Sequence, residues 1–178
     1  MIDTTKLVNR PIEWRSSGTW KKEWGLYDEG KLVASLIKKK VFTYDHQAYY
    51  DDVSLEIKFN EKNDKIEFCD IDSGRTVGDI EDALRRPVSV DGKVKIIWTL
   101  KLEDGTTYSI DLQRHPSPEG AFFRDENGST LARTVFEPGL PLSATFTILS
   151  PQTPISPWLI AISSLYYLIM TMLRGGAF

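Results

Sequence analysis

The sequence has few of the residues that most catalytic and metal sites use. Its 178 residues include one cysteine, Cys69, and two histidines, His46 and His115. A single cysteine excludes an internal disulfide and fits a reducing compartment. The P-loop, GxSxG, HExxH and CxxC motifs are all missing. The sequence therefore predicts no metal, no cofactor and no familiar hydrolase site.

An excess of positive charge is also missing. The chain has 22 basic and 25 acidic residues and a net charge of −3. Nucleic-acid binding depends on a basic excess, so no nucleic acid is expected as a partner. The first ten residues, MIDTTKLVNR, hold no apolar run of the kind found in signal peptides. We therefore expect a cytoplasmic protein.

One long segment, from Pro138 to Leu173, contains no charged residue at all. Within it, WLIAISSLYYLIMTML (residues 158–173) also lacks glycine and proline. Pro157 stands where a helix best tolerates proline, at its first turn. Arg174 and the glycine pair after it are typical of a helix end. These features predict an apolar helix over residues 157–173.

Most of the remaining chain alternates apolar and polar residues with a period of two. Residues 53–59 read VSLEIKF, and residues 94–112 form the clearest hairpin, which turns at Glu103-Asp104-Gly105. Roughly twelve such short strands favour a sandwich or a barrel. One segment departs from the pattern. Residues 78–86 (GDIEDALRR) have acids first, arginines last and Pro87 beyond, which predicts a short surface helix.

Two environments are possible for the apolar helix, the interior of the protein and a lipid bilayer. Sixteen residues of helix span about 24 Å, less than the roughly 30 Å of a bilayer core. Ser164, Tyr167 and Thr171 form a hydroxyl stripe that can bond to protein groups, although serine and threonine can also bond to their own helix. The helix is thus either enclosed by a closed barrel or a membrane anchor.

The order of these elements resembles a known family. WGLYDEGKLVASLI, VSLEIKF with KIEFCDIDSGRTV, DGTTYSIDL and the final PWLIAISSLYYLIMTML are similar in arrangement to the tubby C-terminal-like superfamily. Tubby, LURP-one-related and phospholipid scramblase domains belong to it. The resemblance covers residues 20–173 and implies a closed, twelve-stranded antiparallel β-barrel around a hydrophobic C-terminal helix. Residues 76–87 depart from it. Residues 1–19, without clear period, are expected to be a loosely attached leader to a single domain over 20–178.

The only notable charge cluster is basic. Lys38, Lys39 and Lys40 are consecutive, and Lys21 and Lys22 lie upstream, across a predicted hairpin. Clustered lysines can hold an anionic lipid headgroup, and the resemblance makes this admissible because tubby binds phosphoinositides through basic residues. The alternative is a solvated strand end that discourages aggregation.

Other polar groups are interpreted as structural. His46 and His115 could serve acid–base chemistry, but isolated histidines in loops are more often simply exposed. Asp51-Asp52 and residues 70–74 (DIDSG) are interpreted as turns rather than as a carboxylate pair and a calcium loop.

Three functions follow in order of preference. The first is a non-enzymatic binding or scaffold module at an anionic phospholipid membrane surface or on a protein partner. The second is a tail-anchored membrane protein with a cytoplasmic β domain and residues 157–173 as anchor. An enzyme that uses His46 or His115 is the least favoured.

Overall fold

The computed structural model describes residues 4–16, 23–39, 43–83, 88–90, 93–113, 120–137, 143–151 and 155–173. The elements, in chain order, are a 3₁₀ helix η1 (Thr4–Leu7), thirteen strands and one α-helix. These are β1 (Pro11–Ser16), β2 (Glu23–Asp28), β3 (Lys31–Lys38), β4 (His46–Tyr50), β5 (Val53–Asn60), β6 (Lys65–Asp70), β7 (Thr76–Ile80), β8 (Val88–Val90), β9 (Lys93–Leu102), β10 (Thr107–Gln113), β11 (Gly120–Arg124), β12 (Thr130–Glu137), β13 (Ser143–Ile148) and α1 (Pro157–Leu173).

Twelve of the strands form a closed barrel. The order runs from β10 through β13 to β1 and on to β7, and β9 closes the ring by pairing with both β7 and β10. Every pairing between neighbouring strands is antiparallel. Short β8 pairs with the first residues of β9, beside the ring. The predicted antiparallel β-barrel is confirmed.

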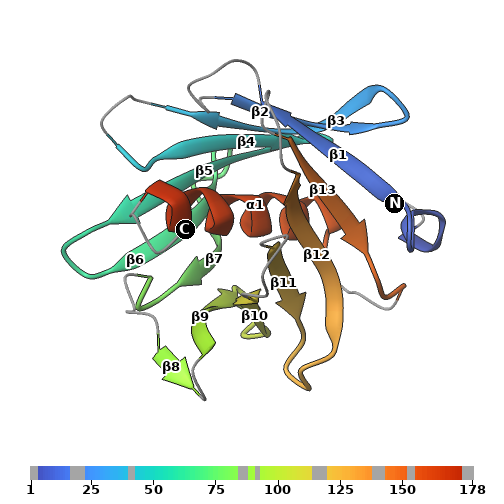
Figure 1. Ribbon diagram of the computed structural model, residues 1–178. Helices are drawn as coiled ribbons and strands as arrows, with labels where there is room; N and C mark the ends of the chain where they lie inside the picture. The colour runs from blue at the N-terminus through green and yellow to red at the C-terminus, as the bar shows by residue number, and fades with distance from the viewer. Residues whose placement is uncertain are drawn as a thin grey trace.

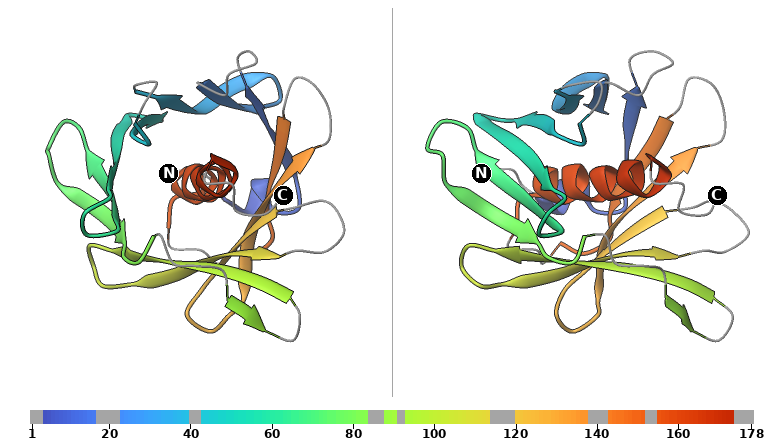
Figure 2. Two further views of the ribbon diagram at one scale, coloured as in Figure 1. Left: turned by 60° about the vertical axis from the view of Figure 1, so that its left-hand side comes forward. Right: turned by 90° about the vertical axis from the view of Figure 1, so that its left-hand side faces the viewer.

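Helix α1 lies inside this barrel, as the view down the ring shows (Figure 2, left). Its side chains are buried from Trp158 through Met170. The helix approaches β11 and β12 most closely, and the inner faces of these strands carry the small side chains of Ala121, Ala132 and Thr134. Larger residues such as Phe68 and Trp98 fill other parts of the core. The predicted helix over 157–173 is confirmed, with protein around it.

The predicted hairpins are also confirmed where the alternation was clearest. In β5 the buried Leu55 and Ile57 alternate with less buried neighbours, and β9 and β10 pair along residues 95–101 and 107–113. The turn between β2 and β3 places Glu29 and Gly30 at φ of 50° and 81°. Glycine adopts such angles without steric cost.

The expectation of a loose leader is wrong for β1. This strand lies between β13 and β2, and its Ile12 and Trp14 are fully buried. Two buried residues are too few to show a period in the sequence, so only the pairing with β13, far away in the chain, reveals the strand. Residues 1–3 and 17–19 lie outside the described residues.

The short surface helix predicted for residues 78–86 is wrong as well. Gly78 and Ile80 belong to β7, which pairs with β6 and β9. A Cβ on Gly78 would lie 3.1 Å from the carbonyl oxygen of Lys101, so glycine permits a close approach of the two strands. Pairing on both sides overrides a charge pattern typical of helices. Residues 84–87 lie outside the described residues.

Within the described residues, no helix combines the length and the apolar character needed to cross a membrane.

Candidate functional site

The predicted lysine cluster begins at the end of β3. Lys38 is the last residue of that strand and is half-buried, and it has no ion-pair partner among the described residues. The backbone N–H of Lys39 donates to the carbonyl of Asp45 at 3.0 Å, and its ammonium group pairs with Glu56. Lys58 pairs with the same carboxylate at 2.9 Å. Hydrogen bonds from Lys39 and Lys58 hold the pKa of Glu56 below its usual value.

The other lysines of the predicted cluster, Lys21, Lys22 and Lys40, lie outside the described residues.

The turns of the barrel fall into two sets, one at each end, because alternate turns of antiparallel strands lie at the same end. We call one the acidic end. It holds the turns β2–β3, β4–β5, β6–β7, β9–β10 and β11–β12. Each of these turns carries two acids: Asp28 and Glu29, Asp51 and Asp52, Asp70 and Asp72, Glu103 and Asp104, Asp125 and Glu126. The opposite, lysine end holds Lys38 and Lys39 and the C-terminus of α1 (Figure 1).

Several of these acids shape their own turns. Asp70, Asp104 and Asp125 accept backbone N–H groups two to four residues ahead at 2.7–3.0 Å. The hydroxyl and then the backbone N–H of Ser73 lower the pKa of Asp70, and the backbone N–H of Thr106 lowers the pKa of Asp104. Asp28 and Glu29 pair with Arg10, and Glu103 with Arg75. Other acids make no ion pair within the described residues; they are Asp51, Asp52, Asp72 and Glu126.

From the sequence, each acidic turn was interpreted by itself, and their shared position at one end of the barrel was missed. The signal was present, because alternate hairpin turns of an antiparallel meander must share an end.

An apolar groove opens on the outer face of the barrel beside the acidic end. We call it the β3–β4 groove; its volume is about 310 Å³ and it is lined by Lys31, Leu32, Val33, Ala34, Ser35, Tyr49, Tyr50 and Asp51. Leu32 is 52 % exposed and Tyr49 38 % exposed. These two side chains give the groove its exposed apolar surface.

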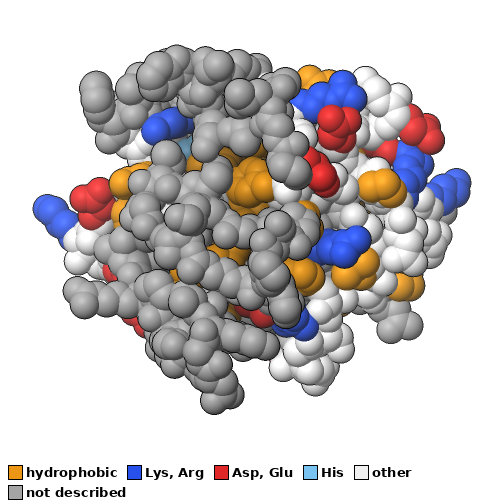
Figure 3. Space-filling view, viewed as in Figure 1, with side chains coloured by type: hydrophobic (Ala, Val, Ile, Leu, Met, Phe, Trp, Pro, Cys, Tyr) orange, Lys and Arg blue, Asp and Glu red, His pale blue; other side chains and the backbone are white. Residues whose placement is uncertain are grey.

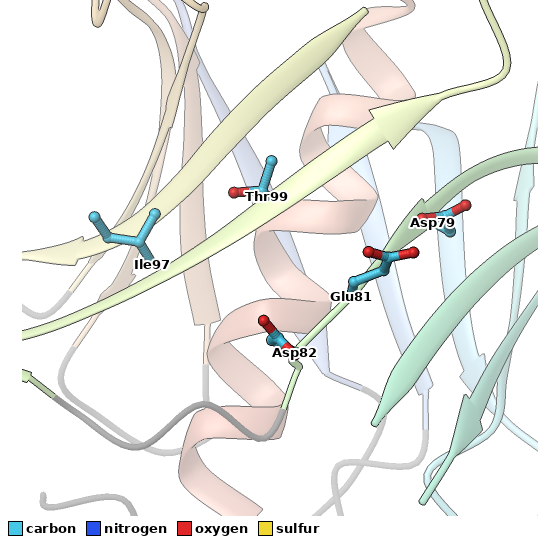
Figure 4. A pocket seen from close by; sticks show the side chains of 5 residues that line it. All are labelled: Asp79, Glu81, Asp82, Ile97 and Thr99. Atoms are coloured by element: carbon cyan, nitrogen blue, oxygen red, sulfur yellow. The ribbon is translucent and has the colours of Figure 1, made fainter. Parts of the chain in front are cut away.

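A second pocket lies where β9 diverges from β7 (Figure 4). It has a volume of about 190 Å³ and is lined by three acids, Asp79, Glu81 and Asp82, together with Ile97 and Thr99. The ammonium group of Lys65 lies 3.4 Å from the carboxylate of Asp79. In the described part of the chain, no group of three or more histidine, cysteine or acidic side chains has an arrangement that could hold a metal ion.

His46 is buried, contrary to the expectation of an exposed loop residue. It begins β4 and is 1 % exposed. Its Nδ1 lies 2.8 Å from the carbonyl oxygen of Tyr44, which also accepts the hydroxyl of Tyr166 at 3.1 Å. A carbonyl only accepts, so Nδ1 carries the proton. Nε2 is buried and has no partner among the described residues, and the ring packs edge-on against that of Tyr166 with 5.2 Å between the ring centres. A substrate in solvent does not reach this ring. His115 lies outside the described residues.

Burial makes the folded state sensitive to acid through His46. Burial lowers the pKa of His46 from 6.5 to about 4, against a weaker opposing effect of the Tyr44 hydrogen bond. The fold thus favours the neutral ring, and stability should fall as pH drops from about 6.5 to about 4 and then level off. We expect a loss of about 3 kcal/mol from this group.

Urea unfolding at a series of pH values checks this expectation. His46→Gln is the matched control, because its amide can still donate to Tyr44 but does not titrate. The difference in unfolding free energy between wild type and variant should shrink toward pH 4. A constant difference over this range would contradict the buried, neutral histidine.

Comparisons with known proteins place the chain in no family: no family model matches it, and neither the curated proteins nor the solved structures give a significant match.

Proposed function

We propose that the chain is a non-enzymatic binding module of tubby-like type that docks on an anionic phospholipid surface through its lysine end. The closed barrel around a C-terminal helix has the arrangement that the resemblance implies, which supports the tubby-like assignment. Because α1 fills the middle of the barrel, the outer surface is the place for a ligand. The protein then acts at the periphery of a membrane facing the cytoplasm.

The unequal charge of the two ends is the observation that carries this proposal. Ten of the 25 acidic residues lie in the five turns of the acidic end. Lys38 and Lys39 lie at the other end, where the described turns carry fewer acids: Asp45, Glu61, Asp64, Glu81 and Asp82. A negative surface therefore repels the acidic end more than the lysine end, which orients the barrel. Each lysine close to such a surface contributes about 1 kcal/mol, within a screening length of about 8–10 Å.

Changing Lys38, Lys39 and Lys40 to glutamine should weaken binding to anionic vesicles. The loss of about 1 kcal/mol for each lysine predicts a weakening of about 100-fold for the triple variant. The ion pair of Lys39 with Glu56 reduces the share of that residue. Co-sedimentation with phosphatidylserine-containing vesicles, compared with pure phosphatidylcholine vesicles, measures the effect.

A charge-matched triple variant provides the control. Three other lysines lie toward the acidic end: Lys6 in η1, Lys31 at the start of β3 and Lys101 near the end of β9. Their change to glutamine alters the net charge of the protein as much as the change of Lys38, Lys39 and Lys40. This control should keep most of the binding. If both triple variants lost the same amount of vesicle binding, net charge alone would explain the loss, and the proposal that the lysine end binds the membrane would be wrong.

A further inference from the structure

The β3–β4 groove has walls that the barrel holds in place. The side chains of Tyr27 and Leu32 cover Gly25. A Cβ added to Gly25 would lie 2.7 Å from the ring of Tyr27 and 2.9 Å from the side chain of Leu32. The guanidinium of Arg15 lies over the ring of Tyr27, 5.1 Å from its centre. Opposite Ser35 in the strand register stands Tyr49, whose hydroxyl donates to the side chain of Gln47 at 3.1 Å. The groove is therefore a built feature of the sheet.

The large apolar side chains that are exposed among the described residues lie in or close to that groove. Only three large hydrophobic side chains are exposed within the described residues: Leu32, Tyr49 and Ile71. Leu32 and Tyr49 line the groove. The N–H of Ile71 donates to the carbonyl of Ser54, and Ser54 pairs with Tyr49 in the register. Apolar groups gathered on one exposed face, rather than scattered singly, mark an interaction surface.

The size of the groove limits what it can receive. About 310 Å³ is at the lower limit of small-molecule sites, about 300–1,000 Å³, and suits one bulky side chain. β3 and β4 are each paired on both sides, so an incoming chain cannot add a strand here. Docking must use a side-chain anchor in a pocket with polar contacts around it.

The charges around the groove decide the partner. Asp51 lines it and Asp52 follows, while Asp70 and Asp72 flank Ile71. On the other side are Asp28 and Glu29, whose charges Arg10 only partly balances. Among the described residues of the lining, Lys31 is the single base. The surroundings are therefore net negative.

We propose that the β3–β4 groove docks a cationic polypeptide segment that inserts one bulky apolar side chain between Leu32 and Tyr49. Basic side chains on either side of this anchor pair with the acids of the neighbouring turns. The site lies at the end opposite the lysines, so it is independent of lipid binding. Together the two ends would let the barrel hold a basic protein segment at an anionic surface.

The test uses the full chain and a short amidated peptide of lysines around one tryptophan. Backbone amide shifts in NMR spectra should change most at residues 31–35 and 49–51. Replacing the tryptophan of the peptide by serine should weaken binding about tenfold, and so should Leu32→Ser or Tyr49→Ser in the protein. Both positions are on the outer face, and spectral dispersion confirms that these variants are folded.

A matched pair of charge variants separates the groove from general attraction. Asp51→Asn removes a charge at the groove and keeps the turn, because asparagine tolerates the φ of 46° found there. Glu126→Gln removes a charge from another turn of the same end. Asp51→Asn should weaken peptide binding about threefold, and Glu126→Gln should change it less.

Two results would overturn the proposal. One is shifts spread evenly over all five acidic turns, with equal affinity for wild type and Tyr49→Ser. The other is self-association without peptide that Tyr49→Ser abolishes, which would assign the groove to a second copy of the chain. The lysine-end variants should bind the peptide like wild type whatever their effect on vesicles.

Discussion

A chain ended after residue 156 is expected to lose its cooperative fold. The removed helix carries eight large apolar side chains that are at most 7 % exposed and pack into the core of the barrel; they are Trp158, Leu159, Ile160, Ile162, Leu165, Leu168, Ile169 and Met170. Burial of each such side chain contributes about 1.5–3 kcal/mol. Even half of that sum, about 6–12 kcal/mol, is as large as the roughly 5–15 kcal/mol by which domains are usually stable.

Circular dichroism and thermal melting of the truncated chain without detergent check this expectation. The full chain in the same buffer, which should melt sharply, is the reference. The truncated chain should give no sharp transition and should aggregate. A tail anchor predicts the reverse, a truncated chain that is more soluble and still folded. A cooperative melt of the truncated chain would therefore contradict a barrel that depends on its helix.

The polar groups of α1 explain why its surroundings were ambiguous in the sequence. The hydroxyls of Tyr166 and Tyr167 bond to carbonyls of the barrel wall, at Tyr44 and Ile96. Ser163 and Thr171 instead donate to carbonyls one helical turn earlier, which they could do equally well in lipid. Of the predicted stripe, only Tyr167 bonds to the barrel; Thr171 bonds to its own helix, and the hydroxyl of Ser164 is buried with no partner among the described residues. The tyrosine hydroxyls, rather than those of serine and threonine, therefore distinguish the two environments.

The sequence predicted the strands that have one face toward the core and one face toward solvent. Within β5 and the β9–β10 hairpin, buried residues recur at every second position, so a period of two is visible in the residues themselves; they are Leu55 and Ile57, Trp98 and Leu100, and Tyr108 and Ile110. The turns were visible for a similar reason, since glycine and acidic residues meet local backbone needs, as at Glu29 and Gly30. The apolar helix was visible from its length and its lack of charge.

The remaining features depend on partners far away in the chain. β1 shows only two buried side chains, and its place is set by β13. In β7 the close packing of Gly78 against β9 determines the structure. The helix prediction failed there because it rested on the charge pattern alone. His46 shares its inward face with Ala48, two residues on, but its burial appears only once Tyr166 packs against it. The acidic end and the β3–β4 groove likewise exist only after the strands are ordered in space.

Leu165→Asp is expected to be the most damaging single substitution in the helix. Leu165 is fully buried at the middle of α1. Removing its side chain alone costs about 2–5 kcal/mol through the cavity left behind. A carboxylate in this apolar interior adds the cost of an unpaired charge, or of a raised pKa that keeps it protonated. We expect a total of at least about 5 kcal/mol, seen as a melting temperature lowered by at least about 10 °C or as no transition at all.

Two further variants show whether burial causes this loss. Leu165→Asn has nearly the same shape without the charge and should lie between wild type and Leu165→Asp. Leu32→Asp makes the same chemical change at a residue that is 52 % exposed on the outer face, and it should shift the melting temperature by no more than about 4 °C. If Leu165→Asp melted as close to wild type as Leu32→Asp does, residue 165 would have to reach water, and α1 could not be enclosed by the barrel.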